Sequence, residues 1–179
     1  MNIFYLHEDP HQAAEWMVDK HVVKMILESA QLLSTAHRVL DGKEIIGKTK
    51  TGRNVKRWIL SDSRESILYQ ATHINHPSAV WCRESVPNYL WLSEHFYALM
   101  DEYTVRYNKK HKCYGELSYA LLSPPKALDK QEFTLMPSCM DDVYKISKDP
   151  IVNYRNYYKI GKADLHSWKN KQPPTWINE

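Results

Sequence analysis

The stretch 19-DKHVVKMILESAQLLSTAHRVLDGK-43 decides the fold class, because its apolar residues follow the 3.6-residue period of an α-helix. At 100° per residue one broad face carries the apolar side chains Val22, Met25, Ile26, Leu33, Ala36 and Leu40. The polar side chains share one narrow stripe, made of Lys20, His21, Lys24, Glu28, Gln31, Thr35 and Arg38. We therefore expect a helix that is buried over most of its surface and carries its polar side chains along one edge, which we call the polar edge.

The same helix is expected to begin upstream of this stretch. Asp9 can accept hydrogen bonds from the first free backbone N–H groups, and Pro10 suits the first helical position. Gly42 supplies a stop signal after the last periodic residue. These signals predict one long helix over residues 10–40.

The rest of the chain reads as further helices joined by irregular segments. Residues 43–57 hold six Lys or Arg against one Glu and predict a basic loop or hairpin. Helices are predicted over residues 62–74, 85–112 and 149–160, with an irregular connector over 113–149. The aromatic tail, residues 163–176, is expected to pack back onto the body.

Length and composition limit the possible fold classes and the cellular compartment. The 179 residues suffice for one core, so we expect a mainly α, compact, single-domain helical bundle over residues 1–179. Three widely spaced cysteines without a CxxC pair favour neither disulfides nor a cysteine zinc site, which suits a reduced cytoplasm. No export signal or long apolar run is present, so no membrane association is expected.

Three ionisable residues on the polar edge form the first candidate site. Glu28 lies four residues after Lys24 and seven after His21, so carboxylate, ammonium and imidazole can face one volume. A carboxylate can stabilise an oxocarbenium ion or move protons, and an amine can attack a sugar carbon. The alternative is an ordinary ion pair on a solvent-facing stripe.

A second candidate lies in 72-THINHPSAVWCRES-85. His73 and His76 have HxxH spacing, but no third ligand is marked, so neither a metal site nor a cofactor is expected. Asn75, His76 and Arg83 offer groups that can grip phosphate and base. A plain turn between helices explains the same residues without any ligand.

Basic residues supply a third candidate, a surface for DNA. The formal charge of +3 permits nucleic-acid binding without requiring it, and a run of exposed charge is also common on other soluble proteins. The residues that we expect to contact nucleic acid are Lys20, Arg38, Arg53, Lys56, Arg57, Asn75, His76 and Arg83. A phosphate-binding P-loop, a GxSxG elbow and an HExxH motif are all absent from the sequence.

Several segments together resemble the phage-type pyrimidine-dimer DNA glycosylases of the endonuclease V type. The matching segments are DKHVVKMILE, HRVLDGKEI, NHP, LMDEYTVRY and the aromatic, basic C-terminal part. The resemblance implies cleavage of an N-glycosidic bond in damaged DNA, with Glu28 as the catalytic carboxylate and His21 lining the site. It also implies that the nucleophile is the N-terminal amine, exposed by removal of Met before a small residue.

This chain differs from that pattern at three positions. Asn2 follows Met1 where the family has a small residue, and Leu27 and Ala30 stand near where it has arginines. These differences leave Lys24 or water as alternative nucleophiles. They also leave room for another substrate on the same scaffold.

Our leading hypothesis from the sequence is a DNA N-glycosylase, with or without cleavage at the abasic site, acting on an extruded or damaged pyrimidine nucleotide. Its catalytic residues are Glu28, His21 and Lys24, its partner is DNA or a nucleotide, and no obligate protein partner is expected. Two alternatives are a non-catalytic nucleic-acid-binding protein and an enzyme that modifies nucleotides or DNA bases.

Overall fold

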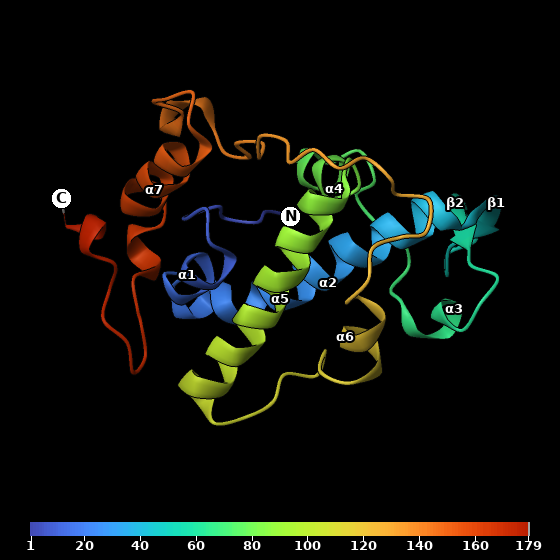
Figure 1. Ribbon diagram of the computed structural model, residues 1–179, viewed down its shortest axis with the longest axis horizontal. Coiled ribbons are helices and arrows are strands. Elements are labelled where there is room, and N and C mark those ends of the chain that lie inside the picture. Colours follow the sequence, from blue (N-terminus) through green and yellow to red (C-terminus); the bar gives the residue numbers. More distant parts are fainter. Residues whose placement is uncertain (179) are drawn as a thin grey trace.

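A computed structural model describes residues 1–178 and is built mainly from α-helices (Figure 1). The helices are α1 Pro10–Glu15, α2 Asp19–Asp41, α3 Arg64–Ile67, α4 Pro77–Cys82, α5 Val86–Tyr107, α6 Glu116–Ala120 and α7 Pro150–Gly161. Short 3-10 turns cover Asp142–Tyr144, Ala163–Leu165 and Thr175–Ile177. Strands β1 Lys43–Lys48 and β2 Asn54–Ile59 pair as one antiparallel hairpin. The predicted mainly α class is confirmed.

The core lies where α2 and α5 cross, with α1 packed beside α5 (Figure 1). The predicted apolar face of α2 is buried, with Val22, Ile26 and Leu33 fully inaccessible. On α5, Ser85 Oγ accepts from the Asn88 N–H at 3.3 Å and caps the start of the helix. The helix ends at Tyr107, five residues short of the predicted end, and the following Asn108 adopts a left-handed conformation (φ 51°).

The predicted single long helix over 10–40 is wrong, because the chain breaks between α1 and α2. Arg106 of α5 donates to the Glu15 and Met17 carbonyls, both at 2.8 Å, and so binds carbonyls at the end of α1. The break also buries Met17 and Val18 completely. Neither Gly nor Pro marks this break, so it has no local signal in the sequence.

Two smaller corrections concern the segment after the hairpin. The predicted helix over 62–74 shrinks to the single turn of α3, and the following residues run on in irregular conformation to α4. Helix α4 was not predicted, although Pro77 stands at its first position and His76 Nδ1 accepts from the Ser78 N–H at 3.2 Å. The basic hairpin itself is confirmed.

The C-terminal half wraps the helices. The irregular connector over 113–149 is confirmed apart from α6 and one 3-10 turn, and it runs past α4 on its way to α7 (Figure 1). The tail packs back as expected: Trp168 Nε1 donates to the Trp16 carbonyl at 2.9 Å, and Trp176 is buried. Within residues 1–178, no helix is both long and apolar enough to cross a membrane.

Candidate active site

The amino end of the chain meets α2 at Glu28. The Asn2 N–H donates to Glu28 Oε2 at 3.2 Å, and the Met1 amino nitrogen lies 4.0 Å from the same oxygen. On the other side of the carboxylate, Lys24 Nζ lies 3.1 Å from Oε1. The Glu28 side chain is 15% exposed and Lys24 is 68% exposed. A partly buried carboxylate therefore stands between a sheltered amino end and an open lysine.

Buried residues hold the amino end in place. Ile3 and Leu6 are fully buried, so the segment that precedes α1 is anchored in the core. Phe4, with a left-handed φ of 58°, stacks on the His21 ring at a centroid distance of 4.1 Å. This anchoring fixes residues 1 and 2 over α2 and limits the freedom of any group that they carry.

His21 lies behind this segment and is 6% exposed. Its Nδ1 shares a 2.6 Å hydrogen bond with the Tyr158 hydroxyl. Burial, assisted by the nearby charges of Lys162 and Lys24, lowers the pKa of His21 to about 3, so the imidazole is neutral at pH 7. This environment suits a residue that positions Phe4 and the amino end.

Asn2 also connects the site to the distant connector. Its Nδ2 donates to the Cys139 carbonyl at 2.7 Å, and its Oδ1 accepts from the Ile3 and Phe4 N–H groups. Ser78 Oγ lies 3.4 Å from Cys139 Sγ, which joins α4 to the same point. The contact between Asn2 and Cys139 was missed by sequence reasoning, because no local pattern indicates a contact across 137 residues.

A cavity of about 420 Å³ opens beside this junction. Its lining residues are His76, Pro77, Pro137, Ser138, Cys139, Met140, Asp141 and Lys145. Burial first, then the charge of the chain's amino group, lower the pKa of His76, while the Glu28 charge opposes this shift.

The other predicted DNA contacts lie on the surface at several places. Lys20 and Asn75 are exposed, whereas Arg83 is half-buried and donates to the Ala79 carbonyl at 2.8 Å. In the hairpin, Arg53 is exposed and Arg57 is partly exposed. Lys56 is paired with Glu44 at 2.8 Å. The hairpin begins fifteen residues after Glu28 along α2, which corresponds to roughly 20 Å of helix.

Arg38 does not belong to a DNA-contacting surface, because its side chain is fully buried. It donates inside the protein to the Glu65 carboxylate at 2.7 Å and to four carbonyl oxygens, those of Trp58, Glu65, Leu68 and Tyr69. All its donor nitrogens are thereby engaged, and none can reach a phosphate. The polar edge of α2 is thus exposed to solvent near Lys24 and buried near Arg38.

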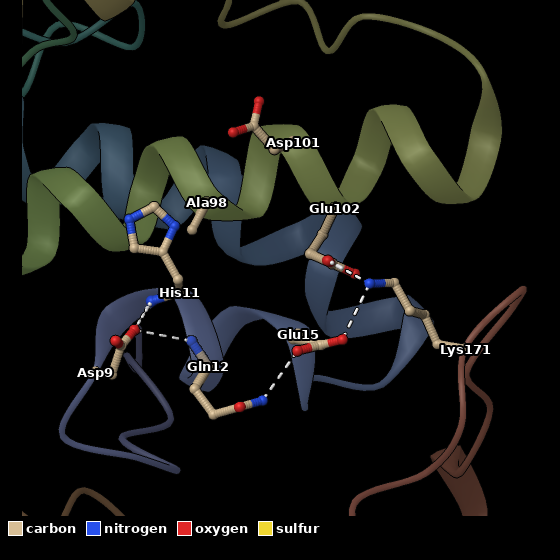
Figure 2. Close-up of a pocket in the computed structure, with 8 residues that line it drawn as sticks. All are labelled: Asp9, His11, Gln12, Glu15, Ala98, Asp101, Glu102 and Lys171. Atoms are coloured by element: carbon tan, nitrogen blue, oxygen red, sulfur yellow. Dashed lines mark hydrogen bonds and ion pairs between the residues drawn. The ribbon is translucent and has the colours of Figure 1, made fainter.

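Another cavity, of about 300 Å³, lies between α1, α5 and the C-terminal tail (Figure 2). Lys171 spans it and contacts Glu15 and Glu102, each at 3.1 Å. These charges compensate one another, and the site residues around Glu28 do not line this cavity. Across residues 1–178 no cluster of His, Cys, Asp and Glu is arranged to hold a metal ion.

Comparison with known proteins gives one family. The model of a DNA repair family, described as pyrimidine dimer DNA glycosylase, matches residues 1–115. The chain therefore belongs to the pyrimidine dimer DNA glycosylase family, and the resemblance noted in the sequence is confirmed. No curated protein and no solved structure matches it. The matched part contains the amino end, Glu28, the hairpin and α4, and it stops before the 137–141 segment.

Proposed function

We propose that this chain excises a damaged pyrimidine from DNA by attack of its α-amino group on C1′ of an extruded nucleotide. The observation that carries the proposal is the amino end beside Glu28, with the Asn2 and Met1 nitrogens 3.2 and 4.0 Å from one carboxylate oxygen. Extrusion is needed because C1′ is shielded inside a stacked duplex. The attacking amine is that of Asn2 once Met1 is removed, or that of Met1 itself.

The proposed reaction uses groups that are already in place. The neutral amine adds to C1′, the bond from C1′ to the base breaks, and the base leaves with the electron pair and takes up a proton. Glu28 stabilises the positive charge on the sugar and accepts the proton that the attacking nitrogen loses. Opening of the sugar ring then gives an imine between the chain and C1′. An imine at this carbon allows elimination of the 3′ phosphate, which is the proposed lyase step.

Lys24 is the rival amine, and its contacts support it less well than those of the α-amino group support the latter. Its Nζ is paired with Glu28 at 3.1 Å, and its side chain is largely exposed to solvent. The α-amino group is held in place by the buried residues that follow it, whereas the Lys24 side chain is exposed to solvent and free to move.

Borohydride trapping tests the proposal. An active preparation, incubated with duplex DNA that holds a cyclobutane pyrimidine dimer, should form a stable covalent adduct, because borohydride reduces the imine to an amine. A variant with an additional residue fused before Met1 should form little adduct, since its amine is displaced from Glu28. Cleavage of the glycosidic bond without any adduct would show that water is the nucleophile and would contradict the proposal.

We propose that the exposed basic residues hold the DNA backbone around this site. Lys20, Arg53 and Arg57 supply charge, and Asn75 and Arg83 flank α4. The spacing of roughly 20 Å along α2 would let the hairpin contact phosphates several base pairs from the extruded nucleotide. The hairpin therefore contributes affinity without taking part in the chemistry.

Salt dependence tests the role of the hairpin. The double variant Arg53→Ala/Arg57→Ala should bind duplex DNA more weakly. It should also reduce the magnitude of the slope of log K against log salt by about 1 to 2, because fewer phosphates are neutralised and fewer counterions are released when the protein binds. Fluorescence anisotropy over a salt series measures this slope. The matched control, Lys109→Ala/Lys112→Ala, removes two exposed charges beyond α5 and should change it less. An unchanged slope in the hairpin variant would remove the hairpin from the DNA surface.

A further inference from the structure

We propose that a methylated ammonium group binds in a cavity formed by α5, the start of α7, the connector and the segment that precedes α1. The cavity has a volume of about 440 Å³, which lies within the usual range for small-ligand sites. Neither His21, Lys24 nor Glu28 lines it, so it is separate from the candidate active site. A ligand bound there would have a role beyond the proposed cleavage of DNA.

Aromatic side chains form much of the cavity wall. The rings of Tyr5 and Trp91 are 5.0 Å apart between centroids and meet at 69°, so they form two adjoining walls instead of one stacked surface. Trp91 Nε1 donates to the Glu8 carbonyl at 2.6 Å, which fixes the indole ring and satisfies its only donor. Phe133 adds an exposed third ring, held edge-on against Trp81. Aromatic rings in such an arrangement attract a cation that lies within about 6 Å of their centroids.

The charge of the lining is negative. Glu8 and Asp149 both line the cavity, and no basic side chain lines it with them. Burial first, then the charges of these two carboxylates, raise the pKa of Tyr5 to about 12, so both act on the same phenol. Asp149 Oδ1 accepts from the Ile151 N–H at 2.8 Å, which fixes this carboxylate as the cap of α7. The cavity between α1 and α5 differs, because Lys171 is paired with its carboxylates there.

These features favour a methylated ammonium group over other cations. A metal ion needs several oxygen, nitrogen or sulfur ligands, and the part of the chain that the structure describes holds no such cluster. An unmethylated ammonium has three N–H donors that all need acceptors, whereas most of this lining is aromatic or aliphatic. Methyl groups on the nitrogen replace those donors with apolar surface and keep the positive charge, so they suit both the rings and the carboxylates.

Choline and its carbon isostere, in which a carbon atom replaces the quaternary nitrogen, test the site because they share a shape and differ in charge. Saturation-transfer NMR of the methyl protons detects binding, and titration calorimetry gives the Kd. We expect choline to bind the unchanged protein and the isostere to bind roughly tenfold or more weakly. An acetylated trimethyllysine amide in the same assays identifies the source of the group. Tighter binding than that of choline would indicate a modified protein side chain, and equal binding a free small molecule.

Two variants with matched chemistry locate the ligand. Phe133→Leu removes an exposed ring, keeps an apolar side chain, and should weaken choline binding roughly 3- to 30-fold. Glu8→Gln/Asp149→Asn removes both charges with little change of shape, and asparagine still caps α7, so this variant should also bind choline more weakly. The control Glu94→Gln/Asp164→Asn removes two exposed carboxylates outside the cavity and should bind choline like the unchanged protein.

Three results would overturn the cation site. The first is that neither choline nor the trimethyllysine amide binds the unchanged protein. The second is equal binding of choline and its carbon isostere, which would show that the cavity takes apolar groups whatever their charge. The third is unchanged choline binding in both cavity variants, which would place the ligand elsewhere. Thermal unfolding of each variant identifies a folding defect, and because the substituted side chains are exposed, we expect melting temperatures close to that of the unchanged protein.

Discussion

Glu28→Gln is expected to slow cleavage of the glycosidic bond by roughly 10²- to 10⁴-fold. Glutamine keeps the size of the side chain and can still accept a hydrogen bond from the Asn2 N–H. It carries no negative charge, so it neither stabilises positive charge on the sugar nor accepts a proton from the attacking amine. Single-turnover cleavage of a duplex that holds one pyrimidine dimer measures the effect.

Binding and a matched control show whether this loss is chemical. DNA affinity of Glu28→Gln should stay close to that of the unchanged protein, because Glu28 is acidic and is not expected to contact phosphate. Glu94→Gln makes the same substitution at an exposed position of α5 and should leave cleavage unchanged. Full activity in Glu28→Gln would remove this residue from the reaction and would require another carboxylate.

Arg38→Met is expected to destabilise the protein by about 3–5 kcal/mol, because it leaves the Glu65 carboxylate without its buried partner. Four backbone carbonyls also lose a donor in the same change. A melting temperature lower by roughly 10 °C follows for a chain of this size. Thermal unfolding followed by circular dichroism measures it.

A second substitution tests the geometry as well as the charge. Arg38→Lys should recover only part of the lost stability, since one ammonium cannot reproduce the planar set of donors of a guanidinium. Lys20→Met, at an exposed position of the same helix, should leave the melting temperature nearly unchanged. We also expect one cooperative transition in each protein, in agreement with a single domain over residues 1–179. A stable Arg38→Met variant would show that this network does not hold the fold.

The sequence predicted the elements whose signals are local. The period of the apolar residues located α2 and α5, and the caps before Pro10 and Pro150 marked two helix starts. The break between α1 and α2 was not predictable in this way, because it depends on Arg106, which is about ninety residues away in the chain. A long-range side chain there overrides a continuous helical pattern.

In the candidate site, too, the sequence predicted local contacts and missed long-range ones. The polar edge identified Glu28 and Lys24 as neighbours, and they are 3.1 Å apart. The same edge also contained Arg38, which the structure buries because the segment after β2 folds over the end of α2. The contact of Asn2 with Cys139 joins two segments that are 137 residues apart in the sequence, and no periodicity carries such information.

The most direct test of the central claim is the identity of the residue that borohydride joins to DNA. Proteolysis of the trapped adduct and mass spectrometry of the peptide that carries the DNA remnant give this identity. We predict that the remnant is on the α-amino nitrogen of the amino-terminal peptide, whether that peptide begins with Met1 or with Asn2. A remnant on Lys24 would contradict the account.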